Sequence, residues 1–80
     1  MLTMQDERQI VDRLALKYLD KCVKNGEIYT SYDLFYDILC DEEYENLIEK
    51  GYIDISNEDL MVMCKEEYDN FFFKPLRWGF

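Results

Sequence analysis

The chain has 80 residues, of which nearly half are hydrophobic and 16% are aromatic. A chain of this length is short for two ordinary domains, and a disordered chain has few aromatics, so we expect one folded domain over residues 1–80. There is no histidine, which removes the commonest general base and the commonest transition-metal ligand. We therefore expect a protein that is not an enzyme, holds no metal and needs no cofactor.

The acidic residues are concentrated in the middle of the sequence. The net charge is −9, and residues 27–69 contain fourteen Asp and Glu against two Lys, whereas residues 1–26 have a slight basic excess. An acidic field repels phosphate backbones and attracts basic surfaces. We therefore expect a protein partner with a basic surface and no direct binding of nucleic acid.

Cysteine spacing and hydropathy place the chain in the cytoplasm. Cys22, Cys40 and Cys64 form no close pair, so neither a secreted disulfide framework nor a metal clip is indicated. No stretch approaches the ~20 apolar residues of a membrane-spanning helix. Residues 1–7 also lack the basic and then apolar order of a signal peptide.

The first predicted helix covers residues 4–24. Thr3 followed by Asp6 is typical of a capping box, and Asn25-Gly26 supplies a left-handed stop. Four basic residues of this helix fall on one face, where they are either solvated or docked on the acidic block within or between chains. This basic stripe consists of Arg13, Lys17, Lys21 and Lys24.

Two shorter helices are predicted next, over residues 31–40 and 42–50. The hydroxyls of Thr30 and Ser31 can cap the first, Asp41 can cap the second, and Gly51 follows the end of the second. The order of these helices, with a short strand after them, resembles a helix-turn-helix or winged-helix core. Because the second helix presents glutamates where a DNA reader presents arginine, lysine or asparagine, the resemblance implies a degenerate domain used for protein contact.

The last predicted elements are a short strand and a fourth helix. Residues 52–55 alternate like a strand, for which residues 28–30 are the only nearby partner. Ser56 and Asp59 form a box-like cap for a helix that runs to about residue 73 and is ended by Pro75. The fold class predicted is all-α or nearly all-α, with about four short helices, a two-stranded piece as the open alternative, and an aromatic tail over residues 74–80.

Carboxylates spaced along the second and third helices form the first candidate site. They can imitate the regular charge of a nucleic acid and occupy a basic groove, or they can simply keep a small aromatic-rich domain in solution. In overall character, though by no motif, the chain resembles the small acidic inhibitors that bacteriophages deploy against host nucleases, including anti-restriction and anti-CRISPR proteins. This resemblance implies a DNA mimic that inhibits a nuclease or another nucleic-acid-binding protein. The candidate partner-binding residues are Asp33, Asp37, Asp41, Glu42, Glu43, Glu45 and Glu49.

Aromatic residues near the end of the sequence form the alternative site. Aromatic side chains are favoured at the centres of interfaces, so this group predicts an adaptor or a homodimer. Folding of Trp78 and Phe80 back onto a small core is equally open. The aromatic candidates are Phe71, Phe72, Phe73, Trp78 and Phe80.

Overall fold

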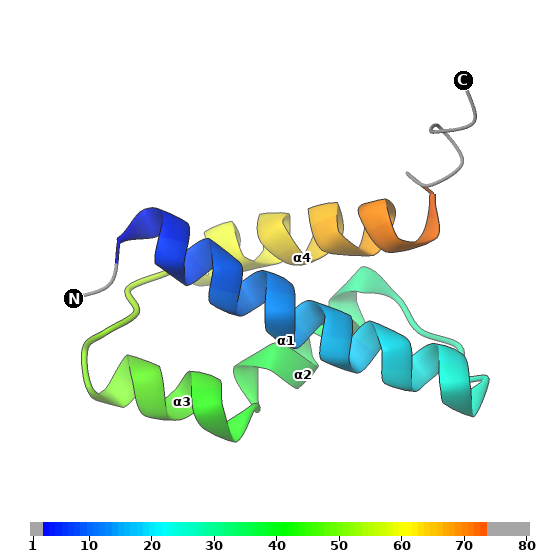
Figure 1. The fold of residues 1–80 in the computed structure, drawn as a ribbon, viewed down its shortest axis with the longest axis horizontal. Coiled ribbons are helices and arrows are strands. Elements are labelled where there is room, and N and C mark those ends of the chain that lie inside the picture. Colours follow the sequence, from blue (N-terminus) through cyan, green and yellow to red (C-terminus); the bar gives the residue numbers. More distant parts are fainter. Residues whose placement is uncertain (1–2, 74–80) are drawn as a thin grey trace.

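The computed structural model describes residues 3–73 and shows, over that range, four helices and no strand (Figure 1). These are α1 (Met4–Asn25), α2 (Ser31–Leu39), α3 (Glu42–Glu49) and α4 (Asn57–Phe72). The all-α class predicted from the sequence is confirmed. Each helix also starts and stops within one residue of its predicted bounds.

Each helix begins at a side chain that caps it. In each of the two capping boxes, the backbone N–H of an aspartate in the first helical turn donates to a threonine hydroxyl. The carboxylate of that aspartate in turn accepts the backbone N–H of the threonine. The four capping residues are Thr3, Thr30, Asp41 and Ser56. α1 ends at Gly26, whose φ of 66° is in the left-handed region that an L side chain adopts only at a cost.

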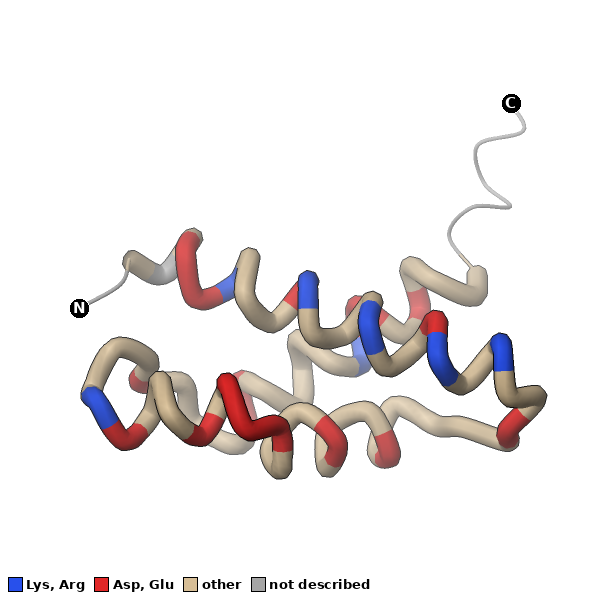
Figure 2. Tube along the Cα trace, turned by 60° about the horizontal axis from the view of Figure 1, so that its bottom comes forward, with Lys and Arg blue, Asp and Glu red and all other residues tan. Residues whose placement is uncertain are grey.

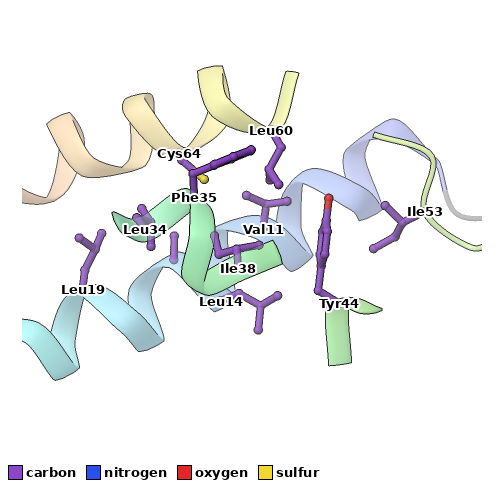
Figure 3. Close-up of a cluster of buried hydrophobic side chains, with 11 residues drawn as sticks. Val11, Leu14, Leu19, Leu34, Phe35, Ile38, Tyr44, Ile53, Leu60 and Cys64 are labelled. Carbon is purple, nitrogen blue, oxygen red and sulfur yellow. The ribbon is translucent and has the colours of Figure 1, made fainter. Parts of the chain in front are cut away.

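The core lies where α1, α2 and α4 meet. α4 runs beside α1 and in the same direction in Figure 1, and both helices contact α2. Figure 3 shows the buried apolar side chains converging from these helices. α3 adds a single buried side chain, Tyr44, which is 1% exposed and lies beside Ile53 and Val11.

The two-stranded alternative is wrong for the described residues, because the backbone of the predicted strand forms hydrogen bonds with the C-terminal part of α3 and not with another strand. The backbone N–H groups of Tyr52 and Ile53 both donate to the carbonyl oxygen of Leu47, at 2.9 and 3.4 Å. Ile53 is then buried in the core, and the half-buried Ile55 packs against it. Residues 28–30, the suggested partner, form a connector without strand pairing.

Three apolar side chains of the helices are exposed. Leu16 and Val23 of α1 are 53% and 54% exposed, and Ile48 of α3 is 42% exposed. The reason is that α1 has neighbours on only part of its circumference, and helical periodicity does not reveal how wide the covered part is.

Candidate protein-binding surface

Five acidic residues recur at every fourth position from α2 into α3. They are Asp33, Asp37, Asp41, Glu45 and Glu49. An α-helix rises ~1.5 Å per residue, so successive members along a helix lie ~6 Å apart. In Figure 2, Asp and Glu follow one another along the edge made by α3 and α2, next to the Lys and Arg of α1.

Asp41 is held inside the chain. Its carboxylate accepts the backbone N–H groups of Glu43 and Tyr44 at 2.9 and 3.2 Å, the Tyr18 hydroxyl at 2.6 Å, and the Lys17 ammonium at 3.4 Å. Burial raises the pKa of Asp41, but the hydrogen bonds from Tyr18, the Tyr44 amide and Lys17 outweigh it, so the pKa lies below its ordinary value. With its side chain 4% exposed, Asp41 fixes the start of α3.

Glu43 is also engaged within the chain. Its two oxygens accept both terminal nitrogens of Arg13, which is the bidentate geometry that makes such pairs strong. The Arg13 hydrogen bond lowers the pKa of Glu43. Together with Lys17 and Asp41, this pair shows that the first half of the basic stripe docks on the acidic block of the same chain.

The two aspartates of α2 are fixed by neighbours but remain at the surface. The exposed Asp33 belongs to the capping box with Thr30, whose backbone N–H it accepts at 2.9 Å. The half-buried Asp37 accepts the hydroxyl of Tyr29. Burial, followed by the Asp37 hydrogen bond, raises the pKa of Tyr29, so this hydroxyl stays a donor.

Three glutamates of α3 are left free to meet a partner. Glu42, Glu45 and Glu49 are all exposed, and none of the ion pairs found among residues 3–73 includes them. Beside them lies an open groove of about 490 Å³ between α1 and α3. Its lining is Lys17, Asp41, Glu42, Glu43, Asn46, Leu47 and Lys50.

The aromatic candidates are only partly described. Phe71 and Phe72 are half-buried and meet edge to face, with ring centroids 5.0 Å apart, while Phe73 is 59% exposed. Trp78 and Phe80 lie outside the described residues. The described part of this group belongs to α4 and its C-cap, so it is a separate surface from the carboxylates of α2 and α3.

The sequence analysis named Arg13 and Lys17 as residues that could dock on the acidic block, but it missed Tyr18 and did not predict which carboxylate each residue contacts. Tyr18 lies 23 residues from Asp41, and Arg13 lies 30 residues from Glu43. No local pattern links residues so far apart. The one available signal was the recurrence of basic residues on one face of the first helix, which left the location of their partners open.

Comparison of the chain with models of protein families, with curated proteins and with solved structures gave no match. Within residues 3–73, no three or more Cys, Asp or Glu side chains are grouped as a metal ion would require. The helices in that part of the chain also lack the combination of length and apolar character needed to cross a bilayer.

Proposed function

We propose that the protein is a non-enzymatic, cytoplasmic binding protein whose acidic row engages a basic surface of another protein. The acidic row is defined as Asp33, Asp37, Glu42, Glu45 and Glu49. The observation that carries the proposal is that its α3 members are exposed and unpaired among residues 3–73, although basic residues of α1 are close by. The carboxylates that face α1, Asp41 and Glu43, are ion-paired with its basic residues, whereas the α3 members of the row have no ion pair among residues 3–73.

The spacing of the row favours a partner built to bind nucleic acid. One strand of a duplex carries a phosphate every ~3.4 Å along the axis. Within the row, Asp33 and Asp37 of α2, and Glu45 and Glu49 of α3, are four residues and therefore ~6 Å apart, which spans about two phosphate steps. A groove of lysines and arginines that follows a phosphate backbone can therefore accept the row in its place. We expect the protein to inhibit a nuclease or another nucleic-acid-binding protein by this mimicry, as phage anti-restriction and anti-CRISPR inhibitors do.

A charge-reversal variant tests the proposal. Glu42→Lys, Glu45→Lys and Glu49→Lys are combined, while Glu43 is kept because its reversal would break the ion pair with Arg13. The assay measures the displacement of a labelled DNA duplex from a panel of nucleases and basic DNA-binding proteins, by fluorescence anisotropy. The native protein should displace the duplex from at least one member, and the variant should lose at least about tenfold in affinity for it.

The matched control reverses three exposed acids elsewhere, through Asp54→Lys, Glu58→Lys and Asp69→Lys. It changes the net charge equally, so it should bind almost like the native protein if the position of the charge matters. Equal losses in the two variants would show that only net charge matters. Failure of the native protein to displace the duplex from any member would exclude nucleic-acid mimicry for the panel tested.

The aromatic residues at the end of α4 support a second candidate, an adaptor or homodimer. Phe73 is 59% exposed, and its ring lies 6.5 Å from that of Tyr68. An interface centred there would be insensitive to salt, whereas binding by the acidic row weakens steeply as ionic strength rises. Sedimentation of the native chain and of Phe73→Ser at low and high salt distinguishes the two candidates.

A further inference from the structure

The outward side of α2 carries a pair of neighbouring tyrosine rings. Tyr32 and Tyr36 are four residues apart on the helix and are 56% and 54% exposed. Their ring centroids are 5.4 Å apart, and the ring planes are tilted by 32°. The buried Phe35 meets both rings edge to face, at 6.2 and 5.6 Å. The two rings are therefore supported from the core and keep open surface toward solvent.

Two carboxylates lie next to these rings, and each is oriented through one of its oxygens. Asp33 is three residues before Tyr36 and four before Asp37, so the three side chains are neighbours on the helix surface. The amide and hydroxyl of Thr30 both donate to Oδ2 of Asp33, at 2.9 and 3.1 Å. The hydroxyl of Tyr29 donates to Oδ2 of Asp37. In both aspartates, Oδ1 accepts no hydrogen bond from residues 3–73.

The basic residues of the described chain are engaged elsewhere or lie away from these rings. Within residues 3–73 the cation over an aromatic ring is Lys17, whose ammonium lies 5.2 Å from the centroid of Tyr18. The ion pairs in the same range include neither Asp33 nor Asp37. The aromatic and acidic groups on the outward side of α2 are therefore available to a cation from another molecule.

The combination of ring and carboxylate favours one kind of cation. A guanidinium is planar, so it can stack on an aromatic ring while its N–H groups donate to a carboxylate beside that ring. An ammonium is a compact, strongly hydrated charge without a flat face, and it gains less from the ring. A surface that offers both groups should therefore prefer arginine to lysine.

We propose that the α2 face, defined as Tyr32, Asp33, Tyr36 and Asp37, binds arginine side chains of the basic protein partner. A guanidinium stacks on a tyrosine ring and donates to Oδ1 of the neighbouring aspartate. This inference rests on the proposed function, because it names the side chain that the partner brings to the α2 end of the acidic row. α3 has no exposed ring, since its one aromatic residue, Tyr44, is buried, so its glutamates contribute charge alone.

The preference is measured with two labelled homopeptides of equal length, one of arginine and one of lysine, by fluorescence anisotropy. The native protein should bind the arginine peptide at least about threefold more tightly. Tyr32→Leu combined with Tyr36→Leu should abolish this preference. Tyr32→Phe combined with Tyr36→Phe is the matched control and should keep it, because phenylalanine retains the ring. Both positions are more than half exposed, and circular dichroism verifies that the helices persist.

Reversal of the α3 glutamates separates this inference from the proposed function. Glu42→Lys with Glu45→Lys and Glu49→Lys should weaken the binding of both peptides and leave the preference for arginine in place. Equal affinity of the native protein for the two peptides would overturn the inference and leave the proposed function standing, as would a preference that survives the leucine variant. Binding of neither peptide would overturn both, because the acidic row would then attract no basic chain.

Discussion

Asp41 connects α1 to the start of α3 through one carboxylate. The hydroxyl of Tyr18 and the ammonium of Lys17 reach it from α1, and two backbone N–H groups reach it from the first turn of α3. Removal of this carboxylate would therefore leave several donors unpaired, one of them on a side chain that is mostly buried. Asp33, the exposed aspartate of the capping box with Thr30, accepts hydrogen bonds only from Thr30 and has no comparable role.

Asp41→Ala should lower the free energy of unfolding by about 3 kcal/mol, because a cap and charged hydrogen bonds are lost together. Asp33→Ala should cost about 1 kcal/mol. Because the pKa of Asp41 is lowered in the folded state, its contribution is present above its ordinary pKa and is lost as the pH falls through the lowered value. Urea unfolding at neutral and acidic pH measures both effects, and equal losses in the two variants would contradict this role.

The hydroxyl of Tyr44 presents the opposite case. It is buried, and it has no hydrogen-bond partner among the described residues. An unpaired buried hydroxyl costs free energy, so Tyr44→Phe should leave stability unchanged or raise it by about 1 kcal/mol, a rise in Tm of about 4–8 °C. Tyr18→Phe is the contrast, because it deletes a hydroxyl that donates to Asp41 at 2.6 Å and should lower Tm. Thermal denaturation of both variants tests the pair, and a clear loss in Tyr44→Phe would show that its hydroxyl is satisfied.

At the scale of elements, the contact between α1 and α4 contains a proton-binding pair. The pKa of Glu67 is raised from its ordinary 4.5 to about 7 by burial and by Asp12, so the folded state holds a proton that the unfolded state releases. Its stabilising contribution is complete below pH 4.5 and is lost as the pH rises through 7. Because the chain has no histidine, no histidine titration overlaps with this change.

Glu67→Gln should therefore stabilise the protein more at pH 8 than at pH 5. After allowance for solvent screening, the difference is about 1 kcal/mol, which corresponds to about 4–8 °C in Tm. The exposed Glu58→Gln serves as the control and should change Tm similarly at the two pH values. Thermal melts followed by circular dichroism at both pH values measure the effect, and parallel curves for native protein and Glu67→Gln would contradict the assignment.

The elements could be predicted from the sequence because their signals are local. Thr3 and Asp6 are three residues apart, and Gly26 follows its helix directly, so a linear pattern contains everything that a cap requires. The strand predicted over residues 52–55 was wrong because alternation of apolar and polar side chains does not show which carbonyl oxygens accept the backbone N–H groups. Here they donate to Leu47, at the end of α3.

The candidate site was less predictable, because contacts between distant residues decide which carboxylates remain available. The positions of Glu43 and Glu45 in the sequence give no reason to separate them. The structure pairs Glu43 with Arg13 and leaves Glu45 exposed. Similarly, the spacing of Leu16 suits a core position, and only the packing of α4 shows that it lies at the edge.

At the scale of the whole molecule, the four helices contribute unequal numbers of buried side chains to the core. α1, α2 and α4 supply most of the core, and α3 contributes Tyr44 as its only buried side chain. The rest of its attachment comes from the half-buried Leu47, which packs against the core, from Asp41, and from the exposed pair of Arg13 and Glu43. The helix with the free glutamates is therefore the most weakly anchored one.

It follows that α3 should detach in brief local openings while the other helices stay folded. Its amide protons should exchange with solvent deuterium faster than those in the middle of α1, with an opening free energy below that of global unfolding. A partner that binds the free glutamates would slow exchange in α3 first, so protection factors recorded with and without it would show where it sits. Uniform protection across all four helices would instead mean that α3 opens only when the whole molecule unfolds.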